Sequence, residues 1–229
     1  MDYVVVMVFN KRGSMPEVDH YGKQVSEQGF TVVPRESVPA DPLSLLRLVE
    51  AGQVRFDGQR PGVLEISKVK TLGASDALLA VHGFALDVFR TIEPTAQFSK
   101  AWIQTSTAET VAGSVNTVPF LPHLDYQRYL KAMWYLVDIS ESNGAMRVAG
   151  ERPEGNELRR QALTPGYKER GDNVFTHRPD SDFVPIEAPA GSLLCFDTNV
   201  PHHAGRVIEG EAKRVVVRFD FAVERWFLG

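Results

Sequence analysis

Hydrophobic residues in the first hundred positions recur at two spacings, one helical and one extended. Val18, Tyr21 and Val25 repeat at the spacing of an amphipathic helix. Gly29 ends this segment, and the short apolar stretch 30–33 that follows predicts a strand. The first half of the chain is therefore predicted to mix helices with strands.

Two further helices begin at recognisable start signals. Asp41 before Pro42 combines an N-cap carboxylate with a proline at the first helical position, and Gly52 ends that segment. Ser75 is a second N-cap and predicts a longer helix that reaches Arg90. The residues predicted to face the core are Leu45, Leu46, Leu48 and Val49 in the first helix, and Leu78, Leu79, Phe84, Leu86 and Phe89 in the second.

The second half of the chain consists of short apolar stretches separated by turns. Asn143-Gly144 is a strong turn signal, and Pro189-Ala190-Gly191 marks another turn. A run of short strands with glycine and proline turns predicts a barrel or a sandwich. The predicted strands cover residues 102–105, 131–139, 183–186, 192–196 and 214–223.

Residues 151–182 break this strand pattern with prolines, glycines and a dense mixture of charges. We interpret them as a long insertion with a short helix over 157–163. Loops of this length are uncommon unless they are functional or disordered. The insertion is therefore expected to line the substrate entrance and to be mobile without ligand. Its six basic and seven acidic residues nearly balance, so they indicate no preference for a phosphate or a CoA ester.

Length and charge restrict the class of protein. The 229 residues with 43% hydrophobic content predict a single domain, in which residues 1–100 support a core built from residues 101–229. A net charge of −4 provides no basic field for nucleic acid or anionic lipid, so a small-molecule partner is expected. The apolar stretch 3–9 predicts a buried strand, and no stretch is long enough to span a membrane. Cys195 is the only cysteine, which favours a reducing, cytoplasmic compartment.

Candidate metal chemistry lies at two separated places in the second half. His123 and Asp125 are two residues apart, so in a strand their side chains point to the same side. Further along, His202 and His203 are adjacent, and only one of them can face the same point. Two histidines and one carboxylate hold Fe(II) while leaving coordination positions open for oxygen chemistry.

Arg214 opens the last apolar strand, which is expected to run beside the second histidine. The distal carboxylate of a 2-oxo acid requires a planar, permanently charged partner, and arginine meets this requirement better than lysine. The combination predicts an oxygenase that uses Fe(II), 2-oxoglutarate and O2.

The order of these motifs resembles that of the phytanoyl-CoA dioxygenase family of 2-oxoglutarate oxygenases. The resembling segments are YGKQVSEQGFTVV, PHLD, WYLVDISESNGAMRVAG and AGSLLCFDTNVPHHAGRV followed by Arg214. They cover most of the chain from Tyr21 onward. The resemblance implies a double-stranded β-helix, or jelly-roll, backed by helices from the N-terminal half.

The resemblance also implies roles for particular residues. His123 and Asp125 match the first two iron ligands, His203 rather than His202 matches the third, and Arg214 matches the anchor of the cosubstrate. Related halogenases replace the carboxylate with a small residue to admit chloride. This chain keeps Asp125, which favours hydroxylation or a related oxidation of a small metabolite.

Three further residues are candidates for contacts with the cosubstrate. Trp134 lies where the family often places an aromatic residue that faces the site, although a core tryptophan is an equally good interpretation. The segment after the distal histidine lacks the hydroxyl residue and asparagine that the family often carries there. A second hydrogen bond to 2-oxoglutarate is therefore expected from Thr198 or Gln104.

Two other functions fit the same residues. A cupin-type metalloenzyme would bind a metal without 2-oxoglutarate and would not need a cation at Arg214. A non-catalytic jelly-roll binding protein would carry the histidines and the carboxylate incidentally. Iron binding separates the second possibility from an enzyme, and the role of Arg214 separates the first.

Overall fold

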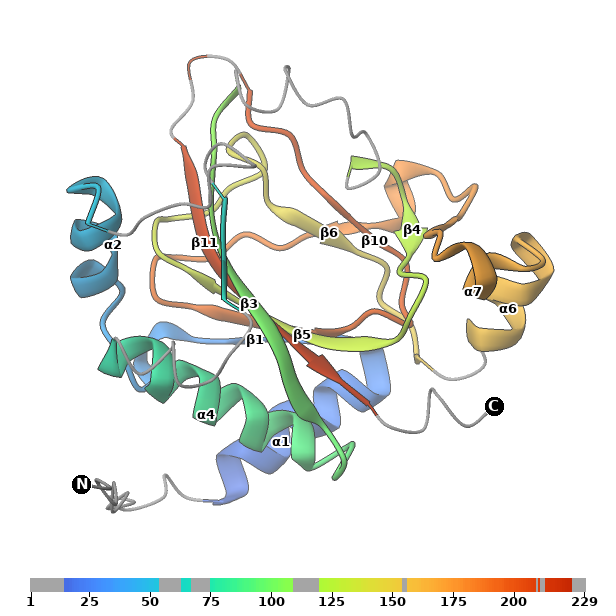
Figure 1. Cartoon of the computed structure of the whole chain (residues 1–229), viewed down its shortest axis with the longest axis horizontal. Helices are drawn as coiled ribbons and strands as arrows, with labels where there is room; N and C mark the ends of the chain where they lie inside the picture. The colour runs from blue at the N-terminus through green and yellow to red at the C-terminus, as the bar shows by residue number, and fades with distance from the viewer. Residues whose placement is uncertain are drawn as a thin grey trace, which may run out of the picture.

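Two antiparallel β-sheets face each other, and helices cover the outer side of the larger one (Figure 1). The double-stranded β-helix predicted from the sequence is therefore confirmed. The predicted strand over residues 3–9 lies outside the part of the chain that this computed structural model describes. The described residues are 15–53, 63–66, 75–108, 120–153, 156–208, 210 and 213–223.

The larger sheet has six strands in the order β1-β9-β5-β11-β3-β2. The predicted stretch 131–139 ends as a regular strand at Tyr135, and Ile139 forms only an isolated bridge with Ala188. The bounds of the six strands are β1 Phe30–Val33, β2 Val63–Ile66, β3 Gln97–Ser106, β5 Tyr129–Tyr135, β9 Leu193–Asp197 and β11 Arg214–Ala222.

The smaller sheet has five short strands in the order β7-β4-β10-β6-β8. Most of these strands escaped the sequence-based prediction because two or three residues are too few to establish a period of two. Their bounds are β4 His123–Leu124, β6 Met146–Val148, β7 Val174–Phe175, β8 Val184–Pro185 and β10 His202–Ala204.

The helices α1 Met15–Gln28, α2 Pro42–Glu50 and α4 Asp76–Arg90 pack on the larger sheet. The predicted caps are confirmed: Asp41 accepts a hydrogen bond from the Leu43 amide, and Ser75 accepts one from the Leu78 amide. The buried face of α4 also includes Val81, His82, Ala85 and Val88, which the sequence-based list omitted.

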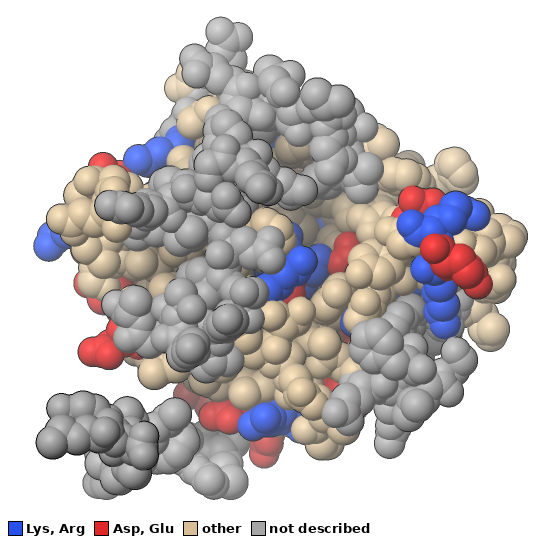
Figure 2. All heavy atoms as spheres, viewed as in Figure 1, with Lys and Arg blue, Asp and Glu red and all other residues tan. Residues whose placement is uncertain are grey.

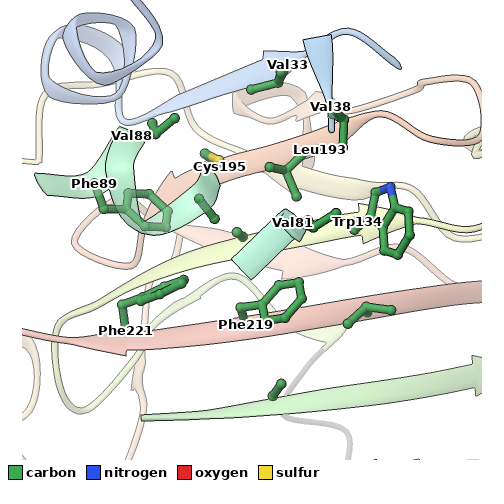
Figure 3. Packing of buried hydrophobic residues seen from close by; sticks show 14 of the residues in the cluster. Val33, Val38, Val81, Val88, Phe89, Trp134, Leu193, Cys195, Phe219 and Phe221 are labelled. Atoms are coloured by element: carbon green, nitrogen blue, oxygen red, sulfur yellow. The ribbon is translucent and has the colours of Figure 1, made fainter. Parts of the chain in front are cut away.

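Alternate residues of the larger sheet enter two different cores. Leu130, Ala132 and Trp134 of β5 join the core that the helices cover, which Figure 3 shows around Trp134. Met133 and Tyr135 of the same strand join the core between the two sheets. The space between the sheets is therefore reached only by every second residue of β5.

Residues 156–185 add two helices beside the smaller sheet, α6 Asn156–Leu163 and α7 Tyr167–Arg170. The first confirms the short helix predicted over 157–163. Two 3-10 turns complete the described elements, at Arg35–Ser37 and Asp180–Asp182.

Charges of both signs are interspersed on the face shown in Figure 2. Lys and Arg atoms lie beside Asp and Glu atoms there, and the described residues form no broad field of one sign on this face. Among the described helices, none is both long enough and apolar enough to cross a membrane.

Candidate metal centre and cosubstrate pocket

Three buried side chains gather on the inner side of the smaller sheet: His123, Asp125 and His202. Each offers one potential ligand atom, and these atoms all lie within 4.8 Å of one another. Nε2 of His123 lies 3.4 Å from Oδ1 of Asp125, and Nε2 of His202 lies 3.5 Å from the same oxygen. The two imidazoles and the carboxylate therefore converge on one point.

Strand pairing explains why these three residues meet. His123 in β4 lies directly opposite His202 in β10 in an antiparallel pair. Residues opposite each other in such a pair project to the same face of the sheet. Asp125 follows His123 by two residues, so the strand period brings its side chain to the same face.

Both histidines hold the tautomer that a metal ligand requires. Nδ1 of His123 lies 2.7 Å from the carbonyl oxygen of Leu121, and Nδ1 of His202 lies 2.9 Å from that of Val200. A carbonyl oxygen can only accept a hydrogen bond, so Nδ1 carries the proton in each ring. Nε2 is left with a free lone pair, the arrangement usual for metal-binding histidines.

Electrostatics also prepares these groups to bind a cation. Burial lowers the pKa of His202 to about 4, so its ring is neutral at pH 7. Burial alone would raise the pKa of Asp125, but the Lys131 ammonium, helped by the two neighbouring imidazoles, outweighs it. They hold that pKa well below its usual range. A neutral imidazole and an ionised carboxylate are the forms that bind metals.

Lys131 determines which oxygen of Asp125 is available. This buried lysine of β5 forms an ion pair with Oδ2 of Asp125. Oδ1 is the oxygen that both histidines approach. The carboxylate can therefore offer one oxygen to a metal while the other remains paired with the ammonium.

His203, the predicted third ligand, faces away from this cluster. It lies opposite Arg147 in β6, whereas its neighbour His202 lies opposite Val148, which belongs to the core between the sheets. Nε2 of His203 lies 3.1 Å from Oδ1 of Asp180 on the outer side. The sequence-based choice of His203 is thus corrected to His202, because neighbouring strand residues project to opposite faces.

Arg214 is buried at the start of β11, on the inner face of the larger sheet. Its Nη1 donates to the carbonyl oxygen of Gly144 at 2.6 Å, and its Nη2 donates to Oγ of Ser106 at 3.3 Å. Burial lowers the pKa of Arg214, but a guanidinium remains charged at neutral pH. No described carboxylate is paired with it.

Two buried polar atoms at this end of the inner face have no hydrogen-bond partner among the described residues. They are Nε of Arg214 and the hydroxyl of Tyr135. The register places Tyr135 opposite Val216, two residues from Arg214 on the same face, and the guanidinium interacts electrostatically with the phenol. Buried groups without partners are rare and call for an explanation such as a ligand.

Two other residues predicted to contact the cosubstrate, Trp134 and Thr198, have different roles in the structure. Trp134 belongs to the core under the helices and donates from Nε1 to the carbonyl oxygen of Gly191, so it cannot face the site (Figure 3). Oγ1 of Thr198 already accepts from the Tyr129 amide and donates to the carbonyl of Gln127. Both expectations are therefore corrected.

Gln104 remains a candidate because it lies opposite Val216 on the inner face of β3. Sequence reasoning missed Tyr135 and Ser106. A signal existed for each, since Tyr135 alternates with Trp134 and Ser106 is two residues from Gln104. Neither signal identifies a site residue unless it is known which face of the sheet the helices cover.

Comparisons with known proteins give the fold and the family of the chain. A search of curated protein sequences finds no match. Among solved structures, the epimerase SnoN from nogalamycin biosynthesis, described as non-heme and α-ketoglutarate-dependent, superposes with a TM-score of 0.62 at 16% identity. The alignment covers 91% of this chain and 84% of SnoN.

Two further structures have the same fold. HygX from Streptomyces hygroscopicus, with nickel and 2-oxoglutarate bound, gives a TM-score of 0.59 at 17% identity, over 90% of this chain and 87% of HygX. EvdO2 from Micromonospora carbonacea var. aurantiaca, complexed with 2-oxoglutarate, gives 0.57 at 13% identity, over 93% and 92%. The model of the phytanoyl-CoA dioxygenase family matches residues 86–215, more than half of the chain, and the chain therefore belongs to that family.

Proposed function

We propose that this protein is an Fe(II)- and 2-oxoglutarate-dependent oxygenase that hydroxylates a small molecule. The observation that carries the proposal is the convergence of two Nε2 lone pairs and one carboxylate oxygen, from His123, His202 and Asp125. Two histidines and a carboxylate are the set that holds non-heme Fe(II) with positions left open.

The pocket around Arg214 supports 2-oxoglutarate as the cosubstrate. The guanidinium offers Nε, and the Tyr135 hydroxyl offers a second donor, neither with a partner among the described residues. Together they suit the distal carboxylate of a 2-oxo acid, which accepts charge-assisted hydrogen bonds. Ser106 orients the guanidinium from its other edge.

Bound iron and 2-oxoglutarate would supply the oxidising power, and the protein supplies the environment. His123 and His202 present Nε2 atoms on rings that their backbone partners orient. Lys131 pairs with one oxygen of Asp125 and leaves the other free. The surrounding apolar residues of the inner core, among them Met133 and Phe196, exclude water from the reacting centre.

A small organic substrate fits the structural neighbours. SnoN has been crystallised with nogalamycin RO, and HygX with hygromycin B. We propose hydroxylation as the outcome because this chain keeps the carboxylate of Asp125, which leaves no vacancy for chloride. SnoN, an epimerase, marks a different outcome that product analysis must separate from hydroxylation.

Anaerobic titration tests the proposal. Purified protein is loaded with Fe(II), titrated with 2-oxoglutarate, and followed by the metal-to-ligand charge-transfer absorption. Saturable appearance of this band, followed by oxygen-dependent succinate formation with a metabolite panel, is the expected result. Iron binding without any response to 2-oxoglutarate would favour a cupin-type enzyme, and absence of iron binding would favour a binding protein.

A further inference from the structure

Arg160 of α6 is completely buried, although it belongs to the segment that composition predicts to be mobile. Its Nε donates to the carbonyl oxygen of Asp125 at 2.8 Å, and its Nη2 donates to that of Thr198 at 3.0 Å. Its Nη1 donates to Oδ1 of Asn199. One guanidinium thus joins the segment that follows β4 to the turn that precedes β10.

Each of these two segments carries a proposed metal ligand. Asp125 is itself a ligand, and His202 follows Asn199 by three residues. We propose that Arg160 is a positioning residue that sets the spacing between Asp125 and His202. This inference rests on the proposed function, because it assigns Arg160 a role toward the metal that those ligands bind. Arginine suits this role because its donors form a rigid planar fork.

The turn that receives the fork is itself held in place. The backbone N–H of Asn199 donates to Oδ1 of Asp197 at 2.8 Å, and Oδ2 of Asp197 pairs with Arg128 at 2.7 Å. Oγ1 of Thr198 accepts from the Tyr129 amide at 2.7 Å. A turn fixed at these points moves as a unit, so its position relative to β4 depends on what spans the gap between them.

The segment that carries the fork, α6 followed by α7, is attached to the outer side of β4. Tyr167 of α7 is fully buried and packs with Leu124 and Val174 in a small apolar cluster. Leu124 lies between His123 and Asp125 and points away from them, as the strand period requires. The α6–α7 segment is therefore attached to the ligand segment by apolar packing as well as by hydrogen bonds, which argues against a mobile entrance.

The test compares Arg160→Gln with Arg159→Gln. Arg159 is the neighbouring arginine of the same helix, and its Nη1 lies 3.1 Å from Glu151, which belongs to neither ligand segment. Calorimetric titration of each metal-free protein with Ni(II) measures the affinity of the folded fraction. Loss of a residue that orients ligands commonly lowers metal affinity by about 10- to 100-fold. We expect this loss in Arg160→Gln and an unchanged affinity in Arg159→Gln.

A purely structural role gives a different result. It would lower the melting temperature of the metal-free protein and leave the affinity of folded molecules unchanged. Arg160→Lys sharpens the distinction, because a single ammonium cannot reproduce the fork and should restore the affinity only in part. This variant also decides the question if Arg160→Gln does not fold.

Two outcomes overturn the inference, and they differ from each other. Wild-type Ni(II) affinity in a folded Arg160→Gln or, failing that, in Arg160→Lys removes the positioning role and leaves the proposed function intact. A wild-type protein that binds no Ni(II) or Fe(II) removes the proposed function, and the positioning role is lost with it.

Discussion

The two faces of the larger sheet are built from the same strands, but one face is apolar and the other holds buried charged groups. On the helix side, β5 and β11 present apolar residues such as Trp134, Val217 and Phe219. On the inner side, alternate positions of these strands present Lys131 and Arg214, both buried. Burying charged groups opposes folding unless partners compensate. The helix side therefore stabilises the fold, and the inner side uses part of that stability to hold charged groups in place.

Trp134 tests the helix side. Trp134→Ala should lower the free energy of unfolding by about 3–5 kcal/mol, because it removes a fully buried indole from a packed core. Urea unfolding measures the loss. Trp134→Phe should recover much of the stability and leave the affinity for 2-oxoglutarate unchanged. A selective loss of cosubstrate affinity in folded Trp134→Phe would return Trp134 to the site and contradict the assignment of the two faces.

Arg214 is the corresponding residue of the inner side. Removing one partner of a buried charge pair commonly costs ~2–5 kcal/mol. Arg214→Ala should therefore raise the dissociation constant of 2-oxoglutarate by about 30-fold or more while Fe(II) still binds. Anaerobic titration of the charge-transfer band provides the measurement, with Arg206→Ala, an exposed arginine, as the control. Equal affinities in the two variants would count against the cosubstrate pocket.

His82 is a titratable group that α4 buries on the helix side, in contact with the rings of Phe98 and Phe221. Burial, with a smaller effect of Arg90, lowers the pKa of His82 to about 4. Below pH 6.5 the unfolded chain therefore binds a proton that the folded chain does not. The contribution of neutral His82 to the free energy of unfolding is complete above pH 6.5. It falls as the pH drops toward 4, by up to about 3 kcal/mol.

His82→Leu should remove this contribution. Unfolding by urea at several pH values between 4 and 7 gives the stability of each protein, and the difference between wild type and variant should change across that interval. Parallel curves for the two proteins would show that His82 is not buried in its neutral form.

Tyr135 provides the finest distinction on the inner side. Its hydroxyl has no partner among the described residues, so Tyr135→Phe should leave the ligand-free protein as stable as before or slightly more stable. One hydrogen bond contributes about 0.5–1.5 kcal/mol, so the 2-oxoglutarate dissociation constant should rise by about 2- to 10-fold. The same titration measures it, and Tyr21→Phe serves as the control. A less stable ligand-free protein with unchanged affinity would make the hydroxyl structural.

Local signals in the sequence were enough for part of this picture. The caps at Asp41 and Ser75, the H-x-D pair and the arginine that begins β11 depend on neighbouring residues or on strand period alone. The choice between His202 and His203 depends instead on register with β4 and β6, strands of two and three residues. Such short strands have no periodicity of their own, so their pairing cannot be deduced from the sequence.

The same limit applies to the larger sheet. The alternation of Trp134 and Tyr135 is visible in the sequence, but which of them faces the site depends on where the helices pack. The role of Arg160 could not be predicted from the sequence for another reason. Its place in a charged, glycine- and proline-containing stretch is typical of exposed loops, and only the tertiary contacts with Asp125 and Thr198 reveal its burial.

The most direct test of the central claim is the comparison of His202→Ala with His203→Ala in metal binding. The two histidines are adjacent in β10, so the two variants remove the same side chain at neighbouring positions. They differ in which face of the smaller sheet loses the imidazole. Anaerobic calorimetric titration with Fe(II) should detect no binding by His202→Ala and wild-type affinity in His203→Ala. Loss of binding in His203→Ala with normal binding in His202→Ala would contradict the register on which the metal centre is built.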